Sequence, residues 1–322
     1  MLWLTWRQHR MQMLVTTALL AVLGVVLLVN GLGAAGFAAQ NPPAAGCPSD
    51  TPACAAYTNG MMEWMWSVGE LIGWLPLLAP AMIGAFWGAP LLAREFEHGT
   101  HRLAWTQSVS RRRWLVVKVG GLGAVVTLGG LALSGIVNAW LAVFDSPAYP
   151  VNFLGNANWF RLVGIVPAAW WLSAFMLGVA TGALFRRTLP AMAVTLALCA
   201  SVFFGLLSAR PFYAAPERHE QTKVMDDSVP EDSLFVAGYW TDRSGARLTD
   251  TEKAIAVAGR CGTDETTTAY ARCTFSHGYR RVEEFHHPSS FWRFQWTEAG
   301  ILLVPALALG GVAARRTLRP RI

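Results

Sequence analysis

The sequence predicts an all-α polytopic membrane protein with six transmembrane helices, both termini in the cytoplasm, and a sizeable extracellular segment between spans five and six. Of its 322 residues, 53% are hydrophobic and only 14% are charged, whereas soluble domains contain about 25% charged residues. The apolar residues form long blocks, and positive charges alternate between the loops that separate them. This composition excludes a disordered chain and argues against a compact water-soluble enzyme.

Six apolar blocks are long enough to cross a bilayer. They lie near residues 12–36, 68–92, 116–142, 161–185, 189–209 and 296–314. Each is close to the ~20 residues that a helix needs to cross about 30 Å of hydrocarbon. The first block follows the basic segment Trp6-Arg7-Gln8-His9-Arg10 and has no small-residue cleavage site, so we expect a retained helix rather than a signal peptide.

The loop charges predict the orientation of these spans. Lys and Arg residues precede the first span, separate spans two and three and spans four and five, and follow span six, whereas loops 37–67 and 143–160 contain none. This pattern places both termini in the cytoplasm and segment 210–295 outside, because long loops are translocated despite their charges. We therefore expect five spans in residues 1–209, an extracellular domain at 210–295, and a sixth span with a basic tail at 296–322.

The cysteines fit this topology. Cys47 and Cys54 belong to the first outer loop, and Cys261 and Cys273 belong to the large outer segment. Each pair is local and lies on the oxidising side, so we expect two disulfide bonds. Cys199, inside span five, is expected to be a small packing residue.

The sequence lacks the groups that would power transport or perform catalysis. The interiors of the spans contain no Asp, Glu, Lys or Arg, which disfavours an ion-coupled carrier. There is no phosphate-binding loop, no H-E-x-x-H motif and no G-x-S-x-G motif. Zinc is an alternative for the outer cysteines and for the acidic and histidine run at 283–287, but neither has a recognised zinc spacing. We expect a non-catalytic chain without its own metal or cofactor, and any uphill transport would draw its energy from another subunit.

The loop between spans two and three, residues 94–114, contains the most informative pattern. We expect span two to continue as a helix from Arg94 and to end at Gly99. Residues 100–107 are expected to form a short helix across the base of the bundle, and Ser110 is expected to cap the helix that leads into span three. This shape suits the docking of a partner. The alternative is a solvated basic loop that only obeys the charge rule.

The same run resembles the inner loop of type-2 permeases of ATP-binding-cassette (ABC) exporters, where a stretch like R-E-x-E-x-G-T…L…T-x-x-x-S-R precedes span three. The matching residues are Arg94, Glu95, Glu97, Gly99, Thr100, Leu103, Thr106, Ser110 and Arg111. The opening Leu4-Thr5-Trp6-Arg7-Gln8-His9-Arg10 is similar to the start of actinobacterial members of that family. The resemblance extends over the whole layout, including an N-terminal interfacial helix and the largest outer segment between spans five and six.

The resemblance implies that residues 94–114 are a coupling element seated in a groove of a separate ATPase subunit, which binds ATP and Mg²⁺. Two permeases and two ATPases would form the exporter in the plasma membrane. The expected partners are therefore an ABC ATP-binding subunit, a second copy of this chain and membrane lipids, without nucleic acid. The residues expected at the ATPase contact are Arg94, Glu95, Glu97, His98, Gly99, Thr100, Arg102, Thr106 and Arg111.

An exporter also needs a translocation path. Met82 and Phe86 of span two and Phe203 and Phe204 of span five are candidates for lining a cavity at the dimer interface, with lipid contact or core packing as the alternative. An apolar cavity would suit a hydrophobic or amphipathic substrate. The rival hypothesis is a membrane-anchored sensor or assembly factor whose binding module is the segment 210–295, which has enough aromatic residues for a small folded domain.

Overall fold

The computed structural model describes residues 2–43, 47, 51–99, 110–147, 151–224, 229–230, 232–262 and 268–318. The chain forms two compact units. The first, called the helical unit, comprises Met1–Val151, Ala157–Ser208 and Gln295–Ile322. The second, called the sheet unit, comprises Asn152–Asn156 and Ala209–Phe294.

Within the described residues, six helical segments are long and apolar enough to cross a membrane, as the sequence predicts. They are His9–Gln40, Cys54–Glu97, Arg112–Phe144, Val166–Phe185, Thr188–Phe212 and Pro288–Leu318. The helices that form them are α1 (Leu2–Gln40), α2 (Pro52–Gly73), α3 (Leu75–Ile83), α4 (Ala89–Glu97), α6 (Arg111–Leu115), α7 (Gly121–Phe144), α9 (Val166–Phe185), α10 (Thr188–Ala209) and α13 (Phe291–Leu318). A short helix, α8 (Ala157–Leu162), precedes α9, and a 3₁₀ turn, η3 (Arg210–Phe212), follows α10.

The second span is interrupted where the sequence places prolines. α2 gives way to α3 at Trp74, and a π-helical segment, η1 (Gly84–Gly88), separates α3 from α4. Pro90 has no N–H to donate to the carbonyl of Phe86, four residues earlier. Gln12 of α1 supplies the missing donor, because its Nε2 lies 2.9 Å from that carbonyl oxygen. A second π-helical segment, η2 (Val116–Gly120), separates α6 from α7.

Glycines allow the second span to pack closely against α9, the most deeply buried long helix of the helical unit. A Cβ atom on Gly84 would lie 2.7 Å from the carbonyl oxygen of Ala174, and one on Gly178 would lie 2.7 Å from the amide nitrogen of Ala89. Only hydrogen atoms fit between the two backbones at such distances. The small residues of spans two and four therefore pack against each other within the chain.

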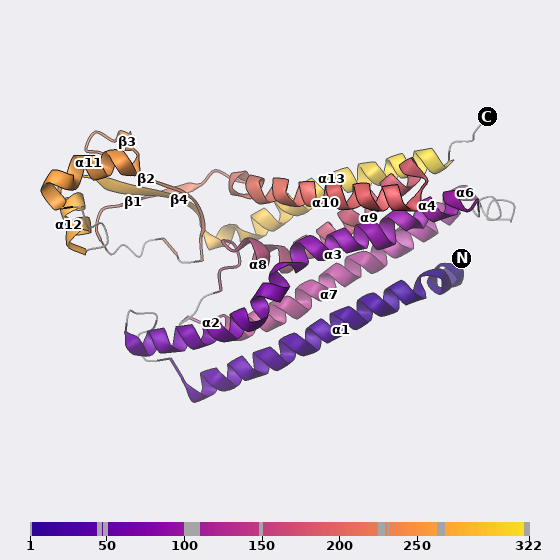
Figure 1. Ribbon diagram of the computed structural model, residues 1–322, viewed down its shortest axis with the longest axis horizontal. Coiled ribbons are helices and arrows are strands. Elements are labelled where there is room, and N and C mark those ends of the chain that lie inside the picture. Colours follow the sequence, from indigo (N-terminus) through magenta and orange to yellow (C-terminus); the bar gives the residue numbers. More distant parts are fainter. Residues whose placement is uncertain are drawn as a thin grey trace. The chain divides into compact units, whose positions relative to one another are not determined.

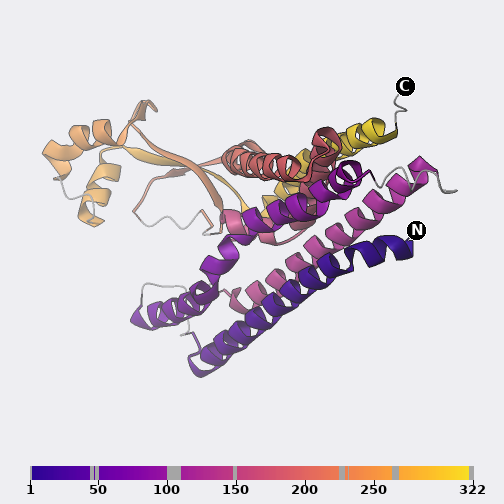
Figure 2. The same ribbon diagram turned by 45° about the vertical axis from the view of Figure 1, so that its right-hand side comes forward.

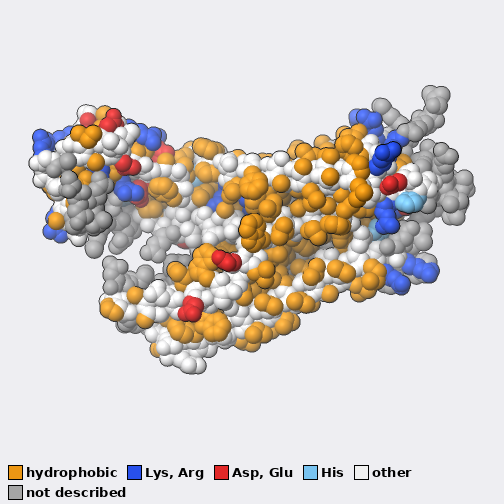
Figure 3. Space-filling model, viewed as in Figure 1, with side chains coloured by type: hydrophobic (Ala, Val, Ile, Leu, Met, Phe, Trp, Pro, Cys, Tyr) orange, Lys and Arg blue, Asp and Glu red, His pale blue; other side chains and the backbone are white. Residues whose placement is uncertain are grey.

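The basic parts of the helical unit gather at one end (Figure 1). The start of α1, the end of α4, α6 and the end of α13 lie there, and the turned view agrees (Figure 2). Lys and Arg side chains crowd this end, while hydrophobic side chains cover the length of the helices (Figure 3). This arrangement matches the grouping of the positive loops in the sequence.

The sheet unit corrects the expectation of an all-α chain. It contains an antiparallel sheet with the strand order β1-β4-β2-β3, formed by β1 (Glu217–Gln221), β2 (Leu234–Thr241), β3 (Arg247–Leu248) and β4 (Arg280–His286). Two helices accompany it, α11 (Asp250–Cys261) and α12 (Thr268–Ser276). The longest strand, Leu-Phe-Val-Ala-Gly-Tyr-Trp-Thr, is rich in the β-branched and aromatic residues that favour strands. The strands of the sheet are much shorter than the ~20 apolar residues of a membrane span, so hydropathy does not reveal them.

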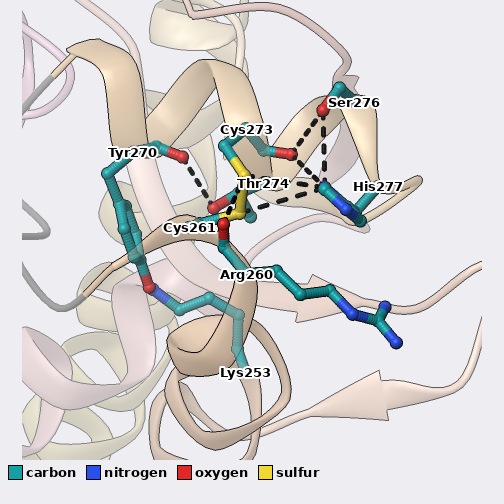
Figure 4. The surroundings of a disulfide bond; sticks show 8 residues. All are labelled: Lys253, Arg260, Cys261, Tyr270, Cys273, Thr274, Ser276 and His277. Atoms are coloured by element: carbon teal, nitrogen blue, oxygen red, sulfur yellow. Dashed lines mark hydrogen bonds between the residues drawn. A yellow bond between two sulfur atoms is a disulfide. The ribbon is translucent and has the colours of Figure 1, made fainter.

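Disulfide bonds join Cys47 to Cys54 and Cys261 to Cys273, the two pairings that the sequence analysis expects. Cys199 is a buried free thiol in α10, packed against Ala81 and Ala174. The Cys261–Cys273 bond ties the end of α11 to α12 within the sheet unit (Figure 4).

Candidate functional site

The candidate site is the connector, residues 94–114, whose two ends the structure describes. α4 ends at Glu97, and Gly99 adopts the left-handed φ of 69° that glycine accepts without strain. At the other end, the Ser110 hydroxyl accepts a hydrogen bond from the Arg113 amide and caps α6. The expected helix at 100–107, with Thr100, Arg102 and Thr106, lies outside the described residues, as does the side chain of Arg111.

Glu95 anchors the end of α4 to the start of the third span. Its Oε1 lies 2.6 Å from Nζ of Lys118 in η2, and the lysine side chain is only 6% exposed. The ammonium group also lies 5.2 Å from the centre of the Trp114 ring. A buried lysine needs a counter-charge, because removing one partner leaves an isolated charge away from water. Glu95 is therefore engaged within the chain.

Glu97 anchors the same helix end to α10. Its Oε2 accepts hydrogen bonds from the backbone amide of Thr188, at 3.1 Å, and from its hydroxyl, at 2.7 Å. Thr188 is the first residue of α10, so the carboxylate satisfies an amide at a helix N-terminus and faces the positive end of the helix dipole. The loop between spans four and five is thereby tied to the connector.

Three of the expected contact residues are exposed at this end of α4, namely Arg94, Glu97 and His98. Arg94 and His98 both lie on the surface, and the His98 ring nitrogen Nδ1 is 3.0 Å from the Arg94 carbonyl oxygen. Phe96 instead lies beneath Arg186, whose guanidinium carbon is 5.2 Å from the centre of the Phe96 ring. A partner that approaches the end of α4 therefore meets Arg94, Glu97 and His98, and one that approaches the start of α6 meets Arg112 and Arg113.

Lys118 and Thr188 were not predicted as partners of the connector, although each stands in an informative sequence context. Lys118 is an isolated cation next to an apolar block, and Thr188 is a hydroxyl residue directly before another. The first pattern is typical of a paired buried charge and the second of a helix start. Neither pattern indicates the partner residue. Glu95 is 23 residues from Lys118 along the chain, and Glu97 is 91 residues from Thr188.

The four candidate path residues separate into two groups. Met82, Phe86 and Phe204 are exposed by 52%, 45% and 56%. Phe203 is buried and packs against Trp170, with their ring centres 5.9 Å apart. Thus three of them are on the surface of the chain, and Phe203 belongs to its interior.

A buried polar network holds α13 against the junction of α8 and α9. Glu298 is fully buried, and its Oε1 accepts from Nε of Arg161, at 3.1 Å, and from the Trp170 indole, at 2.9 Å. One turn earlier, Gln295 accepts from the amides of Ile165 and Val166 through Oε1. The network explains why these charged groups are tolerated beside apolar spans.

In the sheet unit, the sulfur atoms of Cys261 and Cys273 and the imidazole of His277 lie as close together as the ligands of a metal ion would, but their chemistry does not suit a metal. His277 Nδ1 lies 3.6 Å from the Cys273 sulfur and 3.9 Å from the Cys261 sulfur (Figure 4). Both sulfurs are bonded to each other, so neither is a thiolate that could bind zinc. The imidazole also contacts the Cys273 carbonyl at 2.9 Å.

Comparison with known proteins gives one match. The family model described as ABC-2 membrane transporter related matches residues 17–210, more than half of the chain. The matched region contains the connector, both of its anchoring contacts and all or most of the first five candidate spans. Neither a curated protein nor a solved structure matches the chain.

Proposed function

Since the chain belongs to the ABC-2 membrane transporter related family, we propose that it is the permease subunit of an ATP-driven ABC exporter. The observation that supports this proposal is the family match over the first five spans and the connector between spans two and three. In this proposal a separate ATPase subunit binds ATP and Mg²⁺, and this chain supplies the path without catalysing a reaction. Two copies of the chain and two ATPases form the working assembly in the cell membrane, with the basic end in the cytoplasm.

The connector transmits force in this proposal. Closure of the ATPases on ATP pushes the connector, and the push reaches three spans because Glu95 holds η2 and Glu97 holds α10. Both π-helical segments lie within a few turns of these anchors. π-Helical segments occur frequently at functional sites, and here they are the proposed points at which spans two and three bend.

The proposed path lies at the interface between two copies. α1 is exposed along most of its apolar length, and Met82, Phe86 and Phe204 present further apolar surface. An apolar path of this kind suits a hydrophobic or amphipathic substrate, because polar solutes would lose their hydration without compensation. The buried Phe203 contributes to the packing behind this surface.

The proposal is tested by co-purification of the tagged chain from its native membrane. We expect an ABC ATPase to co-purify, with ATP hydrolysis by the purified assembly. Replacing the exposed Arg94 or His98 by Glu should reduce the retained ATPase. Arg315→Glu, the same charge change as Arg94→Glu at an exposed residue of α13, should leave it unchanged. The absence of any ATPase with the unmodified chain would contradict the proposal.

A second candidate is a membrane-anchored sensor or assembly factor. The observation that favours it is the separate sheet unit, which has its own strands, helices and disulfide. In that case the tagged chain should retain a partner through the sheet unit and no ATPase, and the substitutions at Arg94 and His98 should have no effect.

A further inference from the structure

One face of the sheet in the sheet unit is rich in arginine. In the strand register, Arg218 of β1 lies opposite Glu284 of β4, while Arg280 of β4 and Arg247 of β3 both lie opposite Thr241 of β2. Residues directly opposite each other on neighbouring strands point to the same face of a sheet. The three arginines therefore lie on one face, although they come from three different strands.

Helices cover the other face. Trp240 alternates with Tyr239 and Thr241 along β2, so it points away from the arginines. Its ring packs against Phe275 of α12, with centres 5.8 Å apart, and lies 4.9 Å from Nζ of Lys253 in α11. The aromatic core of the unit is thus separated from the arginine face by the thickness of the sheet.

The arginine face is hollowed by a cavity of about 710 Å³, a volume within the usual range for small-molecule sites. Its charged lining comprises Arg218, Arg243, Arg247, Arg280, Glu220 and Asp242. Four guanidinium groups against two carboxylates leave a balance of 4 − 2 = +2. Residues 210–293 as a whole contain 11 basic and 13 acidic residues, a balance of −2, so the cavity opposes the charge of its surroundings.

Two of these guanidinium groups are each held in place by hydrogen bonds from a single nitrogen atom. Arg243 donates through Nε to the His277 carbonyl, and Arg280 donates through Nη1 to the Phe275 and Tyr279 carbonyls. The Arg247 guanidinium lies 4.1 Å from the centre of the Tyr239 ring. A fixed guanidinium loses less conformational freedom when it binds an oxyanion, and its planar fork matches two oxygens at once.

The acidic groups of the lining weaken this charge only in part. Asp242 accepts hydrogen bonds from the Ser244 hydroxyl and from the amides of Ser244 and Ala246, so its charge is held within its own turn. These hydrogen bonds, that of the Ser244 hydroxyl foremost, lower the pKa of Asp242 and keep it charged at neutral pH. Arg218 is paired with Glu284 at 2.9 Å, which leaves Arg243, Arg247 and Arg280 as the principal ligand-facing cations.

We propose that this cavity binds a phosphate group, either of free phosphate or of an anionic lipid headgroup. A phosphate monoester carries a charge of about −1.5 to −2 at pH 7, and the lining opposes it with a net positive charge even when Arg218 is paired with Glu284. Arg247, Arg243 and Arg280 donate to its oxygens. Binding of a phosphate group by the sheet unit does not require coupling to an ATPase.

The test is calorimetric titration of the full-length protein, purified in a neutral maltoside detergent, with inorganic phosphate and separately with dihexanoylphosphatidic acid. We expect saturable binding, and at least tenfold weaker binding for Arg247→Gln, which changes an exposed side chain. Glu220→Gln removes an opposing charge and should tighten binding at least twofold, a gain that misfolding cannot imitate. Arg272→Gln, the matched charge change on exposed α12 outside the cavity, should leave the affinity unchanged.

The two probes identify the source of the phosphate group. Binding of inorganic phosphate that depends on Arg247 indicates a free phosphate site, and dependence seen only with dihexanoylphosphatidic acid indicates a lipid headgroup site. The proposal is overturned if neither probe saturates the unmodified protein, or if Arg247→Gln and Arg272→Gln bind both probes equally well.

Discussion

Replacing Gly178 by alanine should destabilise the helical unit, because the backbone of the second span packs closely against α9 at this glycine. The new Cβ would meet the carbonyl oxygen of Gly84, and it would lie 2.7 Å from the amide nitrogen of Ala89 and 2.9 Å from the Cα of Gly88. All three neighbours are backbone atoms, which cannot rotate out of the way. The two helices must therefore move apart to admit one methyl group.

The magnitude follows from two opposing terms. Overpacking in a well-packed core costs about 1–3 kcal/mol, and three backbone contacts place Gly178→Ala at the upper end of that range. Alanine recovers up to ~1 kcal/mol through its higher helix propensity. The net loss of about 2 kcal/mol should lower the melting temperature by about 4–8 °C, at ~2–4 °C per kcal/mol for a domain of this size.

The assay is thermal unfolding of the purified full-length protein in detergent, followed by tryptophan fluorescence. Gly135→Ala is the matched control, since a Cβ on that glycine of α7 meets nothing within 4 Å. We expect the control to melt at or slightly above the temperature of the unmodified protein. If both variants melt within about 1 °C of each other, the glycine contact does not limit the packing and the reasoning is refuted.

Three further predictions concern the other polar contacts. Glu298→Leu leaves the Arg161 guanidinium buried without its counter-charge, and it should cost about 3–5 kcal/mol in the same melting assay. Asn30→Leu deprives a buried tryptophan indole N–H of its acceptor, and it should cost about 1–3 kcal/mol; no change in melting temperature would contradict either estimate. Hydrogen bonds from the Thr249 amide and hydroxyl lower the pKa of Glu252 below its ordinary 4.5. Thr249 and Glu252 form a capping box at the start of α11, in which each side chain accepts a hydrogen bond from the other's backbone amide. Its contribution to α11 should therefore be complete above pH 4.5 and lost as the pH falls through the lowered pKa. Faster amide exchange in the first turn of α11 at low pH, absent in Glu252→Gln, would measure it.

The sequence predicts the helical unit well because membrane spans depend on local composition. Long apolar runs and alternating loop charges predict six spans, and the described residues contain six candidate helices. The prolines of span two predict a bent helix, and the structure has a break at Trp74 and a π-helical segment before Pro90, although the π-helical form was not predicted. The sheet was missed because its strands are short and the pairing of β1 with β4 joins residues at least 60 positions apart.

The pairing of the connector residues could not be predicted, because it depends on which helices are neighbours. The sequence analysis assigned Glu95 and Glu97 to the contact with an ATPase, and the structure shows both carboxylates bonded within the chain. Nothing in the spacing of Lys118 or Thr188 along the chain indicates that these residues meet the end of α4. Only packing brings them within hydrogen-bond distance, and Arg94 and His98 remain among the exposed residues of the described connector.

The E-x-E spacing of this motif has a geometric reason in the folded chain. Two residues that are two positions apart on an α-helix point about 200° away from each other, on nearly opposite sides. Glu95 therefore reaches η2 on one side of α4, and Glu97 reaches the N-terminus of α10 on the other. A spacing of three or four positions would direct both carboxylates to one neighbour and leave the other helix untied. The acidic residues thus hold the end of α4 between two spans, and a force applied at the connector would act on all three together.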